Sequence, residues 1–268
     1  MKKLILQGIL FFSILFSSWF LLSQVNWMTL FKIESLQKTT EESLGEIYWN
    51  LLKSSEKEIV NKKVLNPLES LVTKICLSNK INPTKIKLHL IKKDEINAFA
   101  LPNNHLVIYT GLIENCENEN ELNGVICHEL AHIELSHIMK KLINEVGTSV
   151  LISIVTNGNN SEIIRKTSKL LTSSSYDRSL EKEADLKAIQ YLEKSLINPT
   201  DFSNFLFKLS LNEAKSTKYL EWISTHPDSE KRAKYILQNI SHKSIKFKTI
   251  LTQKGWENLK NNVSKLFR

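Results

Sequence analysis

The chain has little glycine, proline or cysteine, and these shortages exclude several classes of protein. Only 7 of its 268 residues are glycine and 5 are proline, too few for a collagen-like, propeller or low-complexity chain. The three cysteines are odd in number and include no CxxC pair, so they do not form a disulfide framework. Cys76 could pair with Cys116 in an oxidising compartment, whereas Cys127 is expected to be a small core residue. The composition, 42% hydrophobic and 24% charged, fits one sizeable globular domain, with or without an anchor.

The positive charge is not gathered into a binding surface. The formal net charge is +8, but the 36 lysines and arginines are spread along the chain. The sequence has no basic cluster flanked by aromatic residues and no zinc-finger spacing, so nucleic acid is not an expected partner. A solvated basic surface is the simpler interpretation.

The first 32 residues differ from the rest because they carry almost no charge. Between Lys3 and Lys32 there is no charged residue, and Leu4–Leu22 is strongly apolar. At about 1.5 Å per residue this run approaches the roughly 30 Å thickness of a hydrocarbon core. No A-x-A cleavage site follows it, which favours an uncleaved anchor over a cleaved signal peptide. We therefore expect a single-pass bacterial inner-membrane protein facing the periplasm or cell exterior; the alternative is secretion to the periplasm after cleavage.

Beyond residue 32 the apolar pattern predicts an α+β domain dominated by helices. Residues 33–64 form a helical lead-in, and the segments KIKLHLIKK, INAFALP and HLVIYTGL predict a small antiparallel sheet. Asn118 and Glu121 have the spacing of a helix capping box, and apolar residues then recur at helical intervals as far as Gly147. The rest of the chain is predicted to be mostly helical.

The sequence HELAHIELSH, residues 128–137, carries the strongest chemical signal. His128 and His132 are four residues apart, so on a helix they lie on one face and can bind the same metal ion beside Glu129. A catalytic zinc usually has three protein ligands and one open position. A third ligand is therefore needed, and a salt-bridged helix face remains the alternative for this pattern alone.

The third ligand is not expected from the same helix. The chain lacks the glycine and third histidine of the HExxHxxGxxH peptidases, and His137 lies roughly 140° around a continuous helix from His132. We expect His137 at the surface or behind the ligands. In the later stretch RSLEKEADLKAIQYL, Glu181 and Asp185 share one helix face while Glu183 should point to solvent. Glu181 could bind the metal with Asp185 supporting a ligand histidine; an exposed acidic face is the alternative.

INAFALP, HELAH and RSLEKEAD, in this order, resemble the motifs of the M48 family of membrane-associated zinc metallopeptidases. The resemblance covers about residues 65–240, with residues 241–268 as a C-terminal helical extension, and a single anchor fits the small exported branch of the family. It implies a zincin fold of the gluzincin type that binds one zinc ion per chain. It also implies residue roles: metal ligands His128, His132 and Glu181, catalytic base Glu129, and supporting residues Asp185 and Arg178.

The segment THPDSEKR, residues 225–232, is similar to a late His-Pro…Arg motif of that family. By this resemblance His226 is a candidate regulatory ligand or transition-state donor, and Arg232 is a further supporting residue. A histidine at the start of a helix is the alternative for His226. The chain departs from the family at Asn103–Asn104, where relatives often have Gly–Gly, so the turn there is expected to differ.

The resemblance implies a membrane-associated zinc endopeptidase that hydrolyses peptide bonds of exported or misfolded proteins. Zinc would lower the pKa of bound water to about 7, and Glu129 would accept its proton. A strand edge would bind an extended polypeptide through backbone hydrogen bonds, and its candidate residues are Asn97, Ala98, Phe99 and Ala100; alternate residues of the strand can equally be core. The alternative function is a peptidase-like binding or chaperone module of the cell envelope with little or no proteolysis. Polypeptide substrates and, through the N-terminal segment, the membrane are the expected partners.

Overall fold

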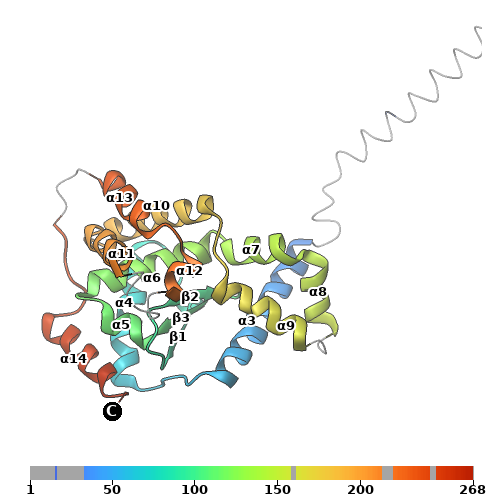
Figure 1. Cartoon of the computed structure of the whole chain (residues 1–268), viewed down its shortest axis with the longest axis horizontal. Coiled ribbons are helices and arrows are strands. Elements are labelled where there is room, and N and C mark those ends of the chain that lie inside the picture. The colour runs from blue at the N-terminus through green and yellow to red at the C-terminus, as the bar shows by residue number, and fades with distance from the viewer. Residues whose placement is uncertain (1–15, 17–32, 158–160, 213–219, 242–245, 268) are drawn as a thin grey trace, which may run out of the picture. The chain divides into compact units, whose positions relative to one another are not determined.

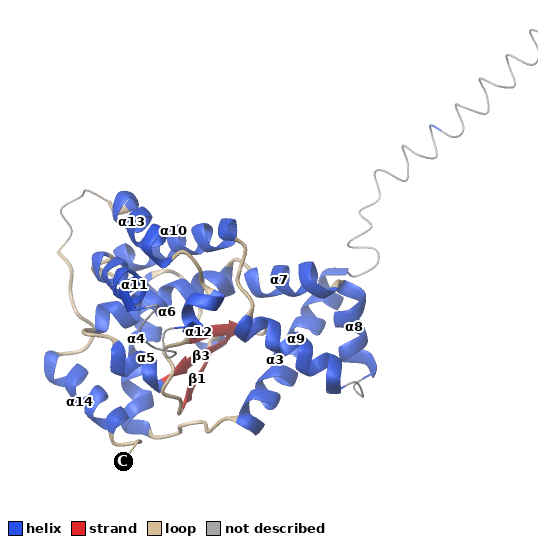
Figure 2. Ribbon diagram, viewed as in Figure 1, coloured by secondary structure: helices blue, strands red, loops and turns tan. Residues whose placement is uncertain are grey.

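The computed structural model describes residue 16 and residues 33–157, 161–212, 220–241 and 246–267. Residues 42–268 form one compact unit, which holds all the elements discussed below except the first turns of helix α3. The unit is mostly helical with a small sheet (Figures 1 and 2). The predicted α+β class dominated by helices is therefore confirmed.

The expected membrane anchor, Leu4–Leu22, lies outside the described residues apart from Phe16. Among the described helices, none combines the length and the apolar character that crossing a bilayer requires. Helix α3 (Ile33–Ser55) has 23 residues, but charged side chains recur along it, whereas a span needs about 20 predominantly apolar residues. The prediction of a single-pass inner-membrane protein is therefore wrong for this structure.

The sheet is mixed rather than antiparallel as expected. Its strands β1 (Lys87–Ile91), β2 (Ala98–Leu101) and β3 (His105–Tyr109) lie in the order β1-β3-β2. β3 runs antiparallel to β2 but parallel to β1, because the hairpin that follows β2 inserts β3 between the other two strands. The apolar pattern identifies the strands, but it does not encode which strands are neighbours.

The turn of the β2–β3 hairpin explains the two asparagines. Asn103 and Asn104 have φ angles of 62° and 59°, so both are in the left-handed region, within the three-residue loop that joins the paired Leu101 and His105. Glycine adopts this region freely, and asparagine is among the few other residues that visit it routinely. The asparagines thus supply a tight turn of the kind that two glycines would allow.

The helix with the HELAH sequence begins where the capping residues predict and ends earlier. In α6 (Glu119–Glu134) the Asn118 side chain accepts the N–H groups of Asn120 and Glu121. The chain then turns at Ser136, whose φ of 54° is left-handed, and a new helix, α7 (His137–Val146), begins. The prediction of one helix as far as Gly147 is wrong, because periodicity does not reveal a single left-handed residue.

Helix α6 is the centre of the unit and packs against β2, α10 and α11. Contact with α11 is close at Gly124, where an added Cβ would lie 2.4 Å from the Cβ of Phe202. Helix α13 packs on α10 and α11, α14 packs on α4 and α5, and α9 lies against β2 and α12. The bounds of the remaining helices are α4 Lys62–Ser78, η1 Pro83–Lys85, α5 Thr110–Asn115, α8 Thr148–Asn157, α9 Ser161–Ser173, α10 Arg178–Lys194, α11 Thr200–Asn212, α12 Leu220–Thr225, α13 Ser229–Asn239 and α14 Gln253–Ser264.

The three cysteines are free and buried. Cys76 and Cys116 therefore do not form the disulfide that an oxidising compartment would allow. Cys127 has no exposed surface and belongs to the hydrophobic core, as its position next to His128 predicted. None of the three takes part in the cluster described next.

Candidate metal centre

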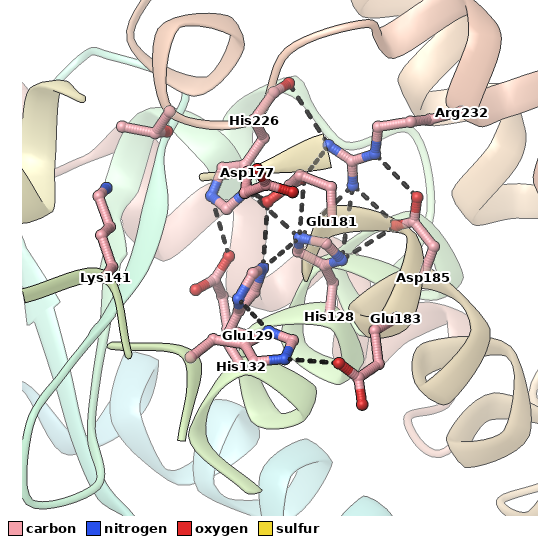
Figure 3. Close-up of polar contacts among 12 residues, drawn as sticks. His128, Glu129, His132, Lys141, Asp177, Glu181, Glu183, Asp185, His226 and Arg232 are labelled. Carbon is pink, nitrogen blue, oxygen red and sulfur yellow. Dashed lines mark hydrogen bonds and ion pairs between the residues drawn. The ribbon is translucent and has the colours of Figure 1, made fainter. Parts of the chain in front are cut away.

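Four side chains that can bind a metal ion converge in the interior of the unit (Figure 3). Helix α6 supplies His128 and His132, α10 supplies Glu181, and the loop between α12 and α13 supplies His226. One ligand atom from each residue lies within 4.8 Å of the others. All four residues are at most 2% exposed, so the cluster lies in the core rather than on an acidic helix face.

The contacts within the cluster run mainly through Glu181. Its Oε1 lies 2.9 Å from Nδ1 of His226 and 3.3 Å from Nε2 of His132. Its Oε2 lies 2.6 Å from Nη1 of Arg232 and 3.6 Å from Nε2 of His128. The Glu181 carboxylate of α10 therefore faces both histidines of α6, because α10 packs along α6.

Asp185 supports His128 from behind. Its Oδ1 lies 3.0 Å from the Nδ1 of His128, and Arg232 holds the carboxylate through two hydrogen bonds of 2.8 Å. Burial raises the pKa of Asp185, but the charge of Arg232 and the hydrogen bonds outweigh it, so the pKa stays below its usual value. Asp185 is therefore an ionised acceptor that keeps the proton of His128 on Nδ1.

The donor set fits a metal ion. Burial lowers the pKa of His128, His132 and His226 to about 4 each, so these imidazoles are neutral at neutral pH and present lone pairs. Since His128 donates from Nδ1, its Nε2 lone pair points towards Nε2 of His132, 3.0 Å away, and towards the Glu181 carboxylate. Electron-rich atoms gathered without solvent repel one another, and a cation among them removes the repulsion. Imidazole nitrogens with one carboxylate oxygen are typical zinc ligands.

Glu129 lies beside the cluster and is fully buried. Its Oε1 is 3.4 Å from Nε2 of His226. Burial raises the pKa of the Glu129 carboxyl well above its usual range, and the nearby charge of Glu181 raises it further. The backbone N–H of Ala100 acts in the opposite direction and lowers this pKa; Ala100 belongs to β2, which packs against α6.

The edge of β2 faces this region. The Tyr109 N–H donates to the carbonyl of Asn97, so by the alternation of an antiparallel ladder the backbone groups of Ala98 and Ala100 point away from β3. Asn97 and the strand residues Ala98, Phe99 and Ala100 are all buried. The expected substrate-binding strand is thus a sheet edge, and its side chains are part of the core.

The two predicted arginines have different surroundings. Arg232 is buried and contacts both Glu181 and Asp185. The side chain of Arg178 is 78% exposed and its Nε bonds Asp228 at 3.0 Å. The structure therefore places Arg178 at the surface, beside the segment that carries His226, and not behind the metal-binding side chains.

Several residues that contact the cluster could not be identified as site residues from the sequence. The ring of Tyr176 stacks on His132 with centroids 4.2 Å apart, and Trp222 stacks on His226 at the same separation. The Lys141 ammonium lies 4.2 Å from the centre of the Tyr176 ring and donates to the carbonyl of Ser174. These residues come from separate elements, and no spacing rule links them to the HELAH helix.

The family model of peptidase family M48 matches residues 62–240 of the chain. The chain belongs to peptidase family M48. The match includes HELAH, the α10 glutamate and the His226–Arg232 segment, so every residue of the buried cluster lies within it. M48 membership, shown by the family model, agrees with the resemblance inferred from the motifs.

Curated relatives of this M48 chain include three proteases. The mitochondrial metalloendopeptidase OMA1 of Schizosaccharomyces pombe is 26% identical over 170 residues, 62% of this chain and 50% of that protein. The beta-barrel assembly-enhancing protease of Yersinia pestis is 26% identical over 204 residues, 72% of this chain and 42% of that protein. The metalloprotease LoiP of Escherichia coli is 29% identical over 180 residues, 63% of this chain and 69% of that protein. The chain thus spans half or less of the first two relatives.

Proposed function

We propose that the protein is a zinc-dependent endopeptidase that hydrolyses peptide bonds in unfolded polypeptide segments. The observation that carries this proposal is the buried convergence of His128, His132 and Glu181 next to the carboxyl of Glu129. Membership of peptidase family M48 and the metalloprotease relatives support it.

The residues of the site have different roles in hydrolysis. His128, His132 and Glu181 would hold the zinc ion, which supplies a Lewis acid that polarises a carbonyl group and lowers the pKa of water. Glu129 accepts a proton from water and returns it to the leaving amine, and a carboxyl whose pKa is raised suits both tasks. Asp185 and Arg232 keep His128 and Glu181 in place.

The edge of β2 would bind the substrate. A polypeptide that adds to this edge pairs with the backbone groups of Ala98 and Ala100 that face away from β3. Strand β2 packs on α6, the helix that carries Glu129, so a bound chain would pass near the catalytic carboxyl. Backbone pairing recognises an extended conformation rather than a particular sequence, which suits misfolded or unfolded substrates.

The position of His226 favours a second candidate function, in which the site is closed to substrate. It contacts Glu181 at 2.9 Å and Glu129 at 3.4 Å, and it has no exposed surface. In this position it would act as a fourth ligand and occupy the place that a substrate needs. A protein held in this state would bind polypeptides with little proteolysis, so His226→Ala should raise peptidase activity if His226 is a regulatory ligand and lower it if His226 stabilises the transition state.

The test compares the unaltered protein with Glu129→Gln. We expect both to bind one zinc ion per chain, measured by atomic emission, whereas Glu129→Gln should cleave an unfolded protein substrate about 10²- to 10⁴-fold more slowly because the general base is lost. Glu134→Gln is a matched control, because Glu134 is an exposed carboxylate on the same helix. Equal cleavage by the unaltered protein and Glu129→Gln would refute the proposed mechanism.

A further inference from the structure

A third histidine of the HELAHIELSH sequence, His137, lies directly behind His132. The Nδ1 of His137 is 3.1 Å from the Nδ1 of His132, and its Nε2 is 3.2 Å from Oε2 of Glu183. His137 has no exposed surface, although the side chain of Glu183 is 52% exposed. A line of contacts therefore runs from a surface carboxylate through a buried imidazole to a side chain of the metal centre.

This arrangement exists because α6 ends before His137. The left-handed Ser136 redirects the chain, and α7 begins at His137, so the imidazole returns to α6 instead of pointing away from it. Glu183 comes from α10, two residues after Glu181. The sequence-based expectation that Glu183 points to solvent is thus incomplete: its side chain is half exposed, yet its carboxylate contacts His137.

The proton positions on His132 and His137 follow from the partners at the two ends of this line of contacts, the metal centre and Glu183. The Nε2 of His132 faces Glu181 and the Nε2 of His128, so His132 would bind a metal ion through Nε2 and would carry its proton on Nδ1. That proton can be donated only if the Nδ1 of His137 is the acceptor, which puts the proton of His137 on Nε2. Glu183 accepts this proton, and each polar atom of the line then has a compatible partner.

We propose that His137 and Glu183 are positioning residues that fix the tautomer and the ring orientation of His132 for metal binding. The inference rests on the proposed function only in taking His132 as a metal ligand. His128 obtains the same support directly from Asp185 at 3.0 Å. The two ligand histidines are thus each backed by a carboxylate of α10, one directly and one through an imidazole, and such partners commonly tune affinity and orientation.

The test measures zinc and cobalt binding to the full-length protein, with metal ions alone as probes. Zinc affinity is obtained by competition with a chromophoric chelator, and the visible spectrum of bound cobalt reports ligand geometry. We expect His137→Phe, which fills the space without polar atoms, to weaken zinc binding by about 10- to 100-fold and to change the cobalt spectrum. His137→Asn keeps an acceptor near the Nδ1 position and should restore part of the affinity.

Glu183→Gln removes the charge at the outer end of the line. Because Glu183 is half exposed, we expect a smaller effect, about three- to tenfold. Glu134→Gln, the exposed control on α6, should leave affinity unchanged. In the His137→Phe background Glu183→Gln should have no further effect, because Glu183 acts on His132 only through His137.

Thermal unfolding of the metal-free variants separates positioning from general stability. The proposal holds if zinc affinity falls while the metal-free melting temperatures of Glu183→Gln and the unaltered protein agree. It is overturned if Glu183→Gln binds zinc as Glu134→Gln does, or if its effect persists in the His137→Phe background. If the unaltered protein binds no zinc, both the proposed function and this inference are refuted. If the unaltered protein binds zinc and the variants bind it equally well, only this inference is refuted.

Discussion

Glu181 and Asp185 lie one turn apart on α10 and serve different partners. Glu181 faces His132 and His226, whereas Asp185 accepts from His128 and is held by Arg232. A single helical turn therefore presents one carboxylate to the centre of the cluster and one to its back. The two positions are not interchangeable, and substitutions at each should fail in different ways.

Replacing Glu181 should empty the metal centre. In Glu181→Ala the only carboxylate of the four-residue cluster is lost, so we expect the variant to lose tightly bound zinc and, with it, peptidase activity. Metal content after dialysis against a weak chelator is the measurement, with Glu134→Gln as the control. Retention of one zinc ion per chain by Glu181→Ala would contradict the assignment of this ligand.

Replacing Arg232 should destabilise the whole unit. Arg232 is buried against Glu181 and Asp185, so Arg232→Met leaves two buried carboxylates without their cation. Removing one partner of a buried ion pair commonly costs about 3–5 kcal/mol, and we expect a loss of this order in the metal-free protein, measured by urea unfolding. Lys231→Met is the control, because the Lys231 side chain is 78% exposed; a loss for Arg232→Met as small as for this control would refute the prediction.

At the scale of elements, the break between α6 and α7 depends on one residue. Ser136 has a left-handed backbone, a conformation that costs a β-branched residue more than serine and costs glycine nothing in steric terms. We expect Ser136→Val to lower the free energy of unfolding by about 1–2 kcal/mol, while Ser136→Gly should leave it unchanged or raise it. Urea denaturation of both variants checks this, and equal stability of the valine and glycine variants would contradict it.

The contact between α3 and the sheet contains a second pair of histidines with a pH-dependent contribution to stability. Nδ1 of His105 lies 2.9 Å from Nε2 of His89, and its Nε2 lies 3.4 Å from Glu46. Burial, together with the neighbouring His89 and Lys87, lowers the pKa of His105 to about 4, although Glu46 acts in the opposite direction. The unfolded chain, with an ordinary histidine pKa near 6.5, therefore binds more protons between pH 6.5 and pH 4.

Acid should weaken the fold through His105. Because the folded pKa is lowered, the contribution to stability is complete above about pH 6.5 and is lost as the pH falls towards 4, by at most about 1.4 kcal/mol per pH unit. Urea unfolding at several pH values measures the slope. His105→Gln removes the titrating group and should flatten it, so parallel slopes for both proteins would show that His105 is not the origin.

At the scale of the whole molecule, the buried cluster links metal binding to folding. A ligand that binds only the folded state stabilises it by about 2.7 kcal/mol at 100 times its dissociation constant. Removing metal with a chelator should therefore lower the melting temperature, and zinc should restore it. Magnesium should not, because it prefers oxygen ligands in an octahedral arrangement, whereas three of the four cluster residues are histidines. Equal protection by magnesium would contradict the expected ligand set.

The sequence by itself determined the features that a single element contains. The spacing of His128 and His132 places them on one face of α6, and that of Glu181 and Asp185 does the same on α10, because an α-helix repeats every 3.6 residues. The Asn118 cap was readable because its side chain bonds the N–H groups of its own helix. The order of the three motifs in the chain was sufficient to indicate the family, since each is a local pattern.

The tertiary structure alone decided which faces meet. Packing of α10 along α6 brings Glu181 to the two histidines, the hairpin order makes the sheet mixed, and the left-handed Ser136 turns His137 back onto His132. None of these three features produces a periodic pattern in the sequence, because each depends on contacts between residues far apart in the chain or on one backbone angle. Local spacing fixes the side chains on each helix face, and long-range packing determines what that face contacts.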